Sequence, residues 1–157
     1  MLGNLGDYHV WTGTQIRKPL EQLTDEEFSR DLGSHSAKSI TQHIVLALET
    51  CFLIATKSSD ESVFTKALKA TKNQLLFRWK ELDRQLAQTL RQNPKGQITV
   101  PHIAAEPFDV NAVDFYLQYI FHTTHHRGQL AIVIRKLGKD VPGTDYLMYL
   151  AQNGKHD

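Results

Sequence analysis

The most informative stretch of this chain is His122-Thr123-Thr124-His125-His126-Arg127-Gly128-Gln129. It lies inside a segment whose hydrophobic pattern predicts an α-helix. Because residues four apart lie one turn apart on the same helix face, His122 and His126 can direct their imidazoles at one metal ion. The residue after His122 is not acidic, unlike the Glu of the His-Glu-x-x-His motif in metalloproteases. The stretch therefore predicts a metal site without a built-in general base.

Length and composition indicate a single domain, residues 1–157, large enough to build its own core. The single Cys51 excludes an intrachain disulfide, and we expect a buried, unreactive thiol in a reducing cytoplasm. We expect neither a signal peptide nor a membrane-spanning segment. The 18 basic and 17 acidic residues give a net charge of +1, so a nucleic-acid partner is not expected. The lysines at 66, 69 and 72 are interpreted as a solvated helix face.

Most of the remaining sequence has a helical pattern. A first helix is expected over residues 2–20, bent or ended by Pro19, followed by a short helical start where Thr24 and Glu27 have capping-box spacing. A second long helix is expected over 36–57, and a third, the longest, over 61–91. Extended chain, a hairpin or a loop is expected over 97–107.

A fourth helix is expected to begin after Asp109 as N-cap and to end near Lys136, where Leu137-Gly138 is a stop signal. A short terminal helix is expected over 145–152. Four long helices with a long crossover between the third and fourth predict an all-α four-helix bundle. Such bundles commonly hold metal sites between facing helices.

A third histidine, His43, lies beside the apolar stripe of the second long helix. If the second and fourth helices are neighbours, His43 can face His122 and His126. Three imidazoles leave other positions of a divalent ion open, and they suit Zn, Ni, Fe or Cu without selecting among them. The alternative is that the three histidines only pack or form hydrogen bonds. His125 competes with His126 but is interpreted as a supporting or surface residue. Structural or surface roles are expected for His9, His35, His102 and His156.

The fourth helix also carries packing signals. Gly128 costs about 1 kcal/mol relative to Ala in a helix interior, which suggests the close approach of a neighbouring helix. Arg127 is expected to pair with an acid that the sequence does not identify. Apolar residues such as Phe115, Ile120 and Phe121 occupy more than one face. A partner subunit, in a homodimer, or the chain's own 98–108 segment would cover them.

The run at 122–129 resembles the H-x-x-x-H-R-G-Q signature of the DinB/YfiT-like superfamily, including its Leu-Gly stop. Ser39-Ile40-Thr41-Gln42-His43 matches the histidine-bearing start of that family's second helix. Weaker similarities are Tyr8-x-x-Trp11 and Asp145-x-x-x-Tyr149-Leu150. The resemblance covers essentially the whole chain. It implies a bundle in up-down-down-up order, usually a homodimer, in which His43, His122 and His126 hold a divalent metal, with Zn or Ni ahead of Fe or Mn.

The superfamily includes proteins that look like S-transferases using a bacterial low-molecular-weight thiol, and others that look like metal-dependent hydrolases or isomerases. We therefore expect an enzyme whose three-histidine site activates a thiol or water for a small-molecule substrate. Gln129 lies one turn past His126, where it can orient a ligand or a water. Thiol S-transfer ranks ahead of hydrolysis because no acid lies within a turn on the His122–His126 face. The alternatives are a non-catalytic metal-binding bundle, acting as a stress-related binding or interaction module, and a bundle that binds no metal. A closed site with four protein ligands would favour the non-catalytic metal-binding bundle.

Overall fold

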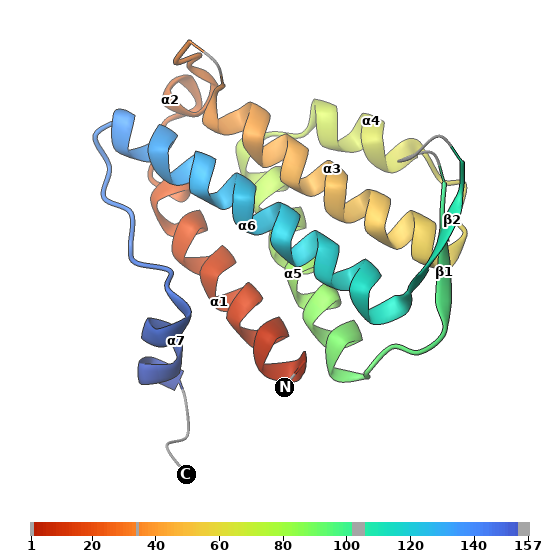
Figure 1. Ribbon diagram of the computed structural model, residues 1–157. Helices are drawn as coiled ribbons and strands as arrows, with labels where there is room; N and C mark the ends of the chain where they lie inside the picture. Colours follow the sequence, from red (N-terminus) through yellow and green to blue (C-terminus); the bar gives the residue numbers. More distant parts are fainter. Residues whose placement is uncertain (1, 34, 102–105, 154–157) are drawn as a thin grey trace.

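The computed structural model describes residues 2–33, 35–101 and 106–153. Its four long helices are α1 (Leu2–Glu21), α3 (Ala37–Thr56), α5 (Lys72–Arg91) and α6 (Ala112–Lys136). Helices α1 and α6 run in one direction and α3 and α5 in the other, which is up-down-down-up order along the chain (Figure 1). Helix α1 packs chiefly against α5, and α3 packs against both α5 and α6. The predicted all-α four-helix bundle is confirmed.

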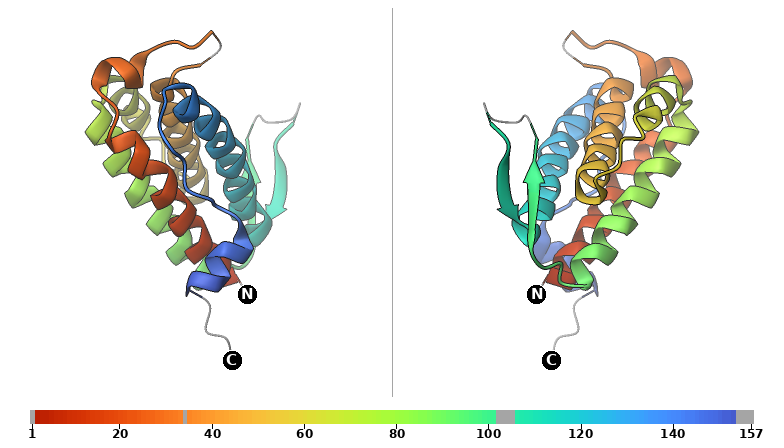
Figure 2. Two further views of the ribbon diagram at one scale, coloured as in Figure 1. Left: turned by 90° about the vertical axis from the view of Figure 1, so that its left-hand side faces the viewer. Right: turned by 90° about the vertical axis from the view of Figure 1, so that its right-hand side faces the viewer.

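The shorter elements connect or flank the bundle. They are α2 (Asp25–Ser29), α4 (Ser62–Lys69), α7 (Tyr146–Asn153) and the strands β1 (Gln97–Val100) and β2 (Phe108–Asn111). The strands form an antiparallel hairpin, with Ile98 opposite Val110, that lies along the α3–α6 side of the bundle (Figure 2). The buried Val100 joins the hairpin to the core. The extended segment expected over 97–107 is therefore part of a hairpin, although residues 102–105, including His102, lie outside the described residues.

The bundle core consists of apolar side chains from all four long helices. Fully buried members include Leu20, Ile44, Leu48, Leu75, Trp79, Leu82, Leu86, Leu130 and Ile134. Each such side chain stabilises the fold by about 1.5–3 kcal/mol relative to an exposed one. Gly6 brings α1 close to α5, because a Cβ there would lie 2.9 Å from the Cα of Ala87. By length and composition alone α3 could cross a membrane, but a core helix of a protein outside the membrane passes the same test.

The single third helix predicted over residues 61–91 is wrong. Helix α4 ends at Lys69, Ala70 is extended, and Thr71 begins α5 with a capping box to Gln74. Thr24 and Glu27 carry the same Thr-x-x-Glu/Gln signal, and the capping box predicted there is present. Because α3 and α5 are parallel neighbours, the chain must return the length of the bundle between them, and α4 lies in that return (Figure 1).

The N-cap predicted for the fourth long helix is also wrong. Asp109 lies within β2 and accepts a hydrogen bond from the Thr99 hydroxyl at 2.6 Å. Asn111 caps α6 instead, since its side chain accepts from the Val113 amide at 2.9 Å. The predicted stop is confirmed: α6 ends at Lys136, and Gly138 has a φ of 75°, the left-handed conformation that glycine adopts without strain.

Candidate metal centre

Helices α3 and α6 bring together the three histidines selected from the sequence. His43 of α3 faces His122 and His126 of α6, and one ring nitrogen from each lies within 4.8 Å of the others. The Nε2 atoms of His43 and His122 are 3.1 Å apart. The ring centroid of His126 lies 4.3 Å from that of His43 and 4.5 Å from that of His122. The predicted metal site required the second and fourth long helices to be neighbours, and these helices, α3 and α6, do pack together.

Local structure explains why His43 points at α6. Ser36 is the N-cap of α3, and its side chain accepts from the Ser39 amide, so His43 lies about two turns into the helix. Its neighbours are held in other directions. Ile44 is fully buried in the core, and the Gln42 amide donates to the Leu68 carbonyl of α4 at 3.1 Å. With those two faces occupied, His43 lies on the remaining face, toward α6.

The donor set fits a divalent transition metal. Zinc–nitrogen bonds of about 2.0–2.1 Å in a tetrahedral site place two ligand nitrogens about 3.3 Å apart. The 3.1 Å separation of the His43 and His122 Nε2 atoms is close to that distance. Burial, and secondarily the neighbouring His126, lowers the pKa of both His43 and His122. Both imidazoles are therefore neutral near pH 7, with lone pairs available to an ion.

Gln129 orients the third imidazole. Its Oε1 lies 2.7 Å from the Nδ1 of His126. Since an amide oxygen can only accept, this Nδ1 carries the proton, and Nε2 is left for the cluster. The amide nitrogen of Gln129 donates to the Nε2 of His125 at 3.2 Å. His125 is exposed and outside the cluster, as expected, and Gln129 lies beside the site as the sequence suggested.

The cluster is open on one side. His43 is exposed, while His122 and His126 are half-buried. Among the described residues, no fourth His, Cys, Asp or Glu joins the three nitrogens. Three protein ligands with a solvent-facing side are typical of catalytic rather than structural zinc sites. An ion held here would have room for water or another small ligand.

A buried ionic network anchors α6 to α1 and α5 immediately beside His126. The Asp83 carboxylate of α5 accepts from Arg17 Nη1 at 2.6 Å, and its other oxygen lies 2.8 Å from His9 Nε2 and 3.2 Å from Arg127 Nη2. The Trp79 indole also donates to it, at 3.1 Å. Asp83 is thus the acidic partner of Arg127 that the sequence left open. The network positions α6, and with it the two histidines that α6 supplies.

The charges in this network are set by the surroundings. Burial would raise the pKa of Asp83, but the hydrogen bond from His9 and the charges of Arg127 and Arg17 outweigh it and lower the pKa to about 2. Burial and the Arg127 charge lower the pKa of His9, so His9 is neutral and donates from Nε2 to Asp83. Two guanidinium groups therefore share one carboxylate. Within the described residues, Arg127 Nε has no hydrogen-bond partner, which leaves the network strongly dependent on Asp83.

His9 has a structural role, as expected. It is fully buried and belongs to this network, and its partners Asp83 and Arg127 lie far from it in the sequence. The sequence signal for the network is Asp83, an acid inside the leucine-rich stripe of α5.

The close helix approach expected at Gly128 is wrong: it occurs at Gly6, against Ala87, whereas Gly13 leaves room for side chains of the network. A Cβ at Gly13 would overlap the Asp83 carboxylate, whereas one at Gly128 would meet nothing within 4 Å.

Comparison with known proteins agrees with the fold and the site. No curated protein matches the chain. The sequence model of the DinB family, however, matches residues 2–156, a span that contains the four long helices and all three clustered histidines. The chain belongs to the DinB family.

Proposed function

We propose that this protein is a divalent-metal-dependent enzyme that activates a thiol or a water molecule for reaction with a small-molecule substrate. The observation that carries the proposal is the open cluster of His43, His122 and His126, with two Nε2 atoms 3.1 Å apart and a side facing solvent. Membership of the DinB family supports the same conclusion. Zn or Ni is proposed ahead of Fe or Mn, because a nitrogen site generally binds Ni²⁺ more tightly than Fe²⁺ or Mn²⁺ and imidazole also suits Zn²⁺.

Each residue has a defined task in this proposal. His43 and His122 contribute neutral imidazoles because their pKa values are lowered by burial. Gln129 holds His126 in the tautomer that leaves Nε2 free. Arg127, through Asp83, keeps α6 fixed against α1 and α5. A bound divalent ion would supply Lewis acidity, which lowers the pKa of a coordinated thiol or water toward neutrality.

Thiol S-transfer is proposed ahead of hydrolysis. Hydrolysis usually needs a general base within hydrogen-bond reach of the attacking water. Among the described residues, no carboxylate joins the histidine cluster. A thiol, whose pKa of about 8.5 is already much nearer to neutrality than that of water, needs no such base once it is activated. A screen should therefore vary both the low-molecular-weight thiol and the substrate that it attacks.

The experiment uses tag-free protein loaded with Zn²⁺ or Ni²⁺. One assay follows transfer of a low-molecular-weight thiol to 1-chloro-2,4-dinitrobenzene, and the other follows hydrolysis of 4-nitrophenyl acetate. We expect metal-dependent thiol transfer that is lost in His126→Ala and kept in His125→Ala, the neighbouring histidine outside the cluster. Metal binding without activity in either assay, across thiols and electrophiles, would favour the alternative of a non-catalytic binding module.

We also propose that the protein is a cytoplasmic homodimer. Phe121 and Ile132 are 62% and 56% exposed and lie about three turns apart on one face of α6. A second copy of the chain would cover this apolar face. The proposed location follows from the single buried Cys51, which suits a reducing compartment.

A further inference from the structure

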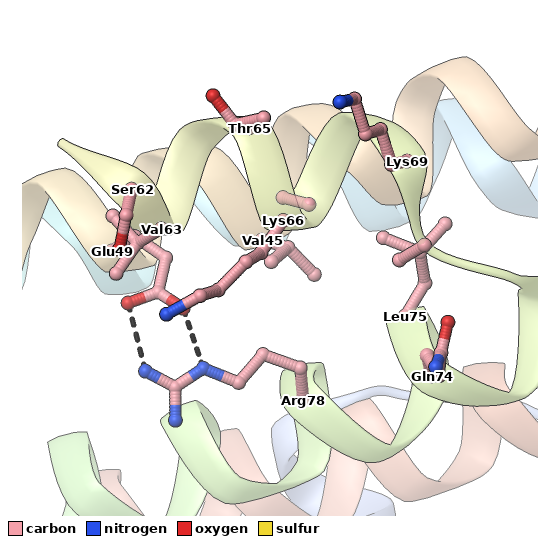
Figure 3. Close-up of a pocket in the computed structure, with 12 residues that line it drawn as sticks. Val45, Glu49, Ser62, Val63, Thr65, Lys66, Lys69, Gln74, Leu75 and Arg78 are labelled. Carbon is pink, nitrogen blue, oxygen red and sulfur yellow. Dashed lines mark hydrogen bonds and ion pairs between the residues drawn. The ribbon is translucent and has the colours of Figure 1, made fainter.

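A groove of 850 Å³ opens between α4 and α5, with α3 as its floor (Figure 3). Its apolar lining comes from Val45, Val63, Ala67, Ala70 and Leu75. Val45 follows His43 by two residues on α3, a rotation of about 200° around the helix. The groove and the histidine cluster therefore occupy different sides of α3.

The topology explains why a groove forms here. Helices α3 and α5 run parallel, so the chain must return between them, and the returning helix α4 has only eight residues. Helix α4 packs on α3, where Gln42 holds the carbonyl of Leu68. A short return helix that is fixed to α3 cannot fill the whole space beside α5. The remaining space is the groove.

One end of the groove carries positive charge. The Glu49 carboxylate, 5% exposed, is paired with the Arg78 guanidinium, in which Nη2 lies 2.8 Å from Oε2. Figure 3 shows the Lys66 side chain extending into the groove toward this pair, whereas the Lys69 amine points away from it. Among the residues that line the groove, Arg78 neutralises Glu49, so Lys66 gives the lining at this end a net positive charge; Asp60 and Glu81 lie near it but outside the lining.

We propose that the groove binds an amphipathic anion: a small carboxylate with an unbranched apolar chain. The carboxylate would lie against the Lys66 amine, beside the Glu49–Arg78 pair, and the chain would lie over Val45, Ala70 and Leu75. The volume falls within the range of about 300–1,000 Å³ that is common for small-ligand pockets. Charge complementarity selects the anion, and the apolar lining selects the chain. This site is separate from the proposed metal chemistry and does not depend on it.

The test is an NMR titration of the full-length, ¹⁵N-labelled protein with hexanoate, octanoate and decanoate, and with decan-1-ol as the uncharged analogue. We expect decanoate to shift amide signals of α4 and of residues 70–78. Each added CH₂ group should tighten binding by about 2–4-fold, because it buries further apolar surface. Decan-1-ol should bind more weakly than decanoate.

A matched pair of variants isolates the charge. Lys66→Gln and Lys69→Gln remove the same charge from the same short helix, but only Lys66 points at the Glu49–Arg78 pair. We expect Lys66→Gln to weaken decanoate binding by about 2–5-fold, the range for a solvent-accessible ion pair, with little change for Lys69→Gln. Equal effects of the two variants, shifts centred on residues 122–129, or no shifts at millimolar decanoate would each overturn the proposal.

Discussion

Replacing Asp83 by Asn removes the only carboxylate among the described partners of a network that contains two buried guanidinium groups. Arg17 and Arg127 are 4% and 5% exposed, and Asp83 is fully buried. Asn has nearly the same shape, so packing is kept while the two positive charges lose their counter-charge. Breaking a buried ion pair by removing one partner typically costs about 3–5 kcal/mol. We expect that loss in the free energy of unfolding.

The measurement is urea unfolding followed by circular dichroism, with thermal unfolding in parallel. For a chain of 157 residues, 1 kcal/mol corresponds to about 2–4 °C, so the Tm should fall by about 6–20 °C. Adding Arg17→Met to Asp83→Asn should recover part of the loss, because it removes one of the two unpaired charges.

The matched control is Glu81→Gln, which makes the same chemical change two residues away on α5. Glu81 pairs with Arg84 at the surface, where the two side chains are 40% and 57% exposed. Such pairs contribute at most about 1 kcal/mol. If Asp83→Asn lost no more stability than Glu81→Gln, the argument that this network anchors α6 would be refuted.

Three further predictions concern pH, metal affinity and assembly. Because burial lowers the pKa of His9, unfolding takes up a proton below pH about 6.5, so stability should fall by up to about 1.4 kcal/mol per pH unit there. His9→Gln should flatten the profile of urea unfolding between pH 7 and 5, and an unchanged slope would contradict a neutral buried His9. Gln129→Leu should weaken Zn²⁺ binding by about 10–100-fold in a competition titration, whereas His125→Ala should leave it nearly unchanged. Phe121→Glu should convert a dimer to a monomer in light scattering, and a monomeric wild type would remove the proposed dimer.

The parts of the fold that could be predicted are those with local signals. The cap at Thr24 and the Gly138 stop each involve residues within one turn, and their hydrogen bonds are present. The split of the predicted third helix had an equally local signal in Thr71 and Gln74. The heptad spacing of the leucines at 68, 75 and 82 favours one continuous helix and conflicts with that signal. Leu68 is in fact 59% exposed on α4.

In the candidate site too, the features with local sequence signals could be predicted and those that depend on helix packing could not. The spacing of His122 and His126 places both on one helix face, and their convergence needs only one helix. Their approach to His43 depends on which helices pack together, which a single sequence does not specify. The buried network is further removed from local signals, since Arg127 and His9 are 118 residues apart in sequence. Its existence follows from packing geometry, including the missing side chain of Gly13.

The central claim is that His43, His122 and His126 together hold one divalent ion. The most direct measurement is the metal content of tag-free protein by elemental mass spectrometry, for the wild type, His126→Ala and His125→Ala. The account predicts about one divalent ion per chain in the wild type and in His125→Ala, and its loss in His126→Ala. A wild-type protein without bound metal that also takes up neither Zn²⁺ nor Ni²⁺ would contradict the account.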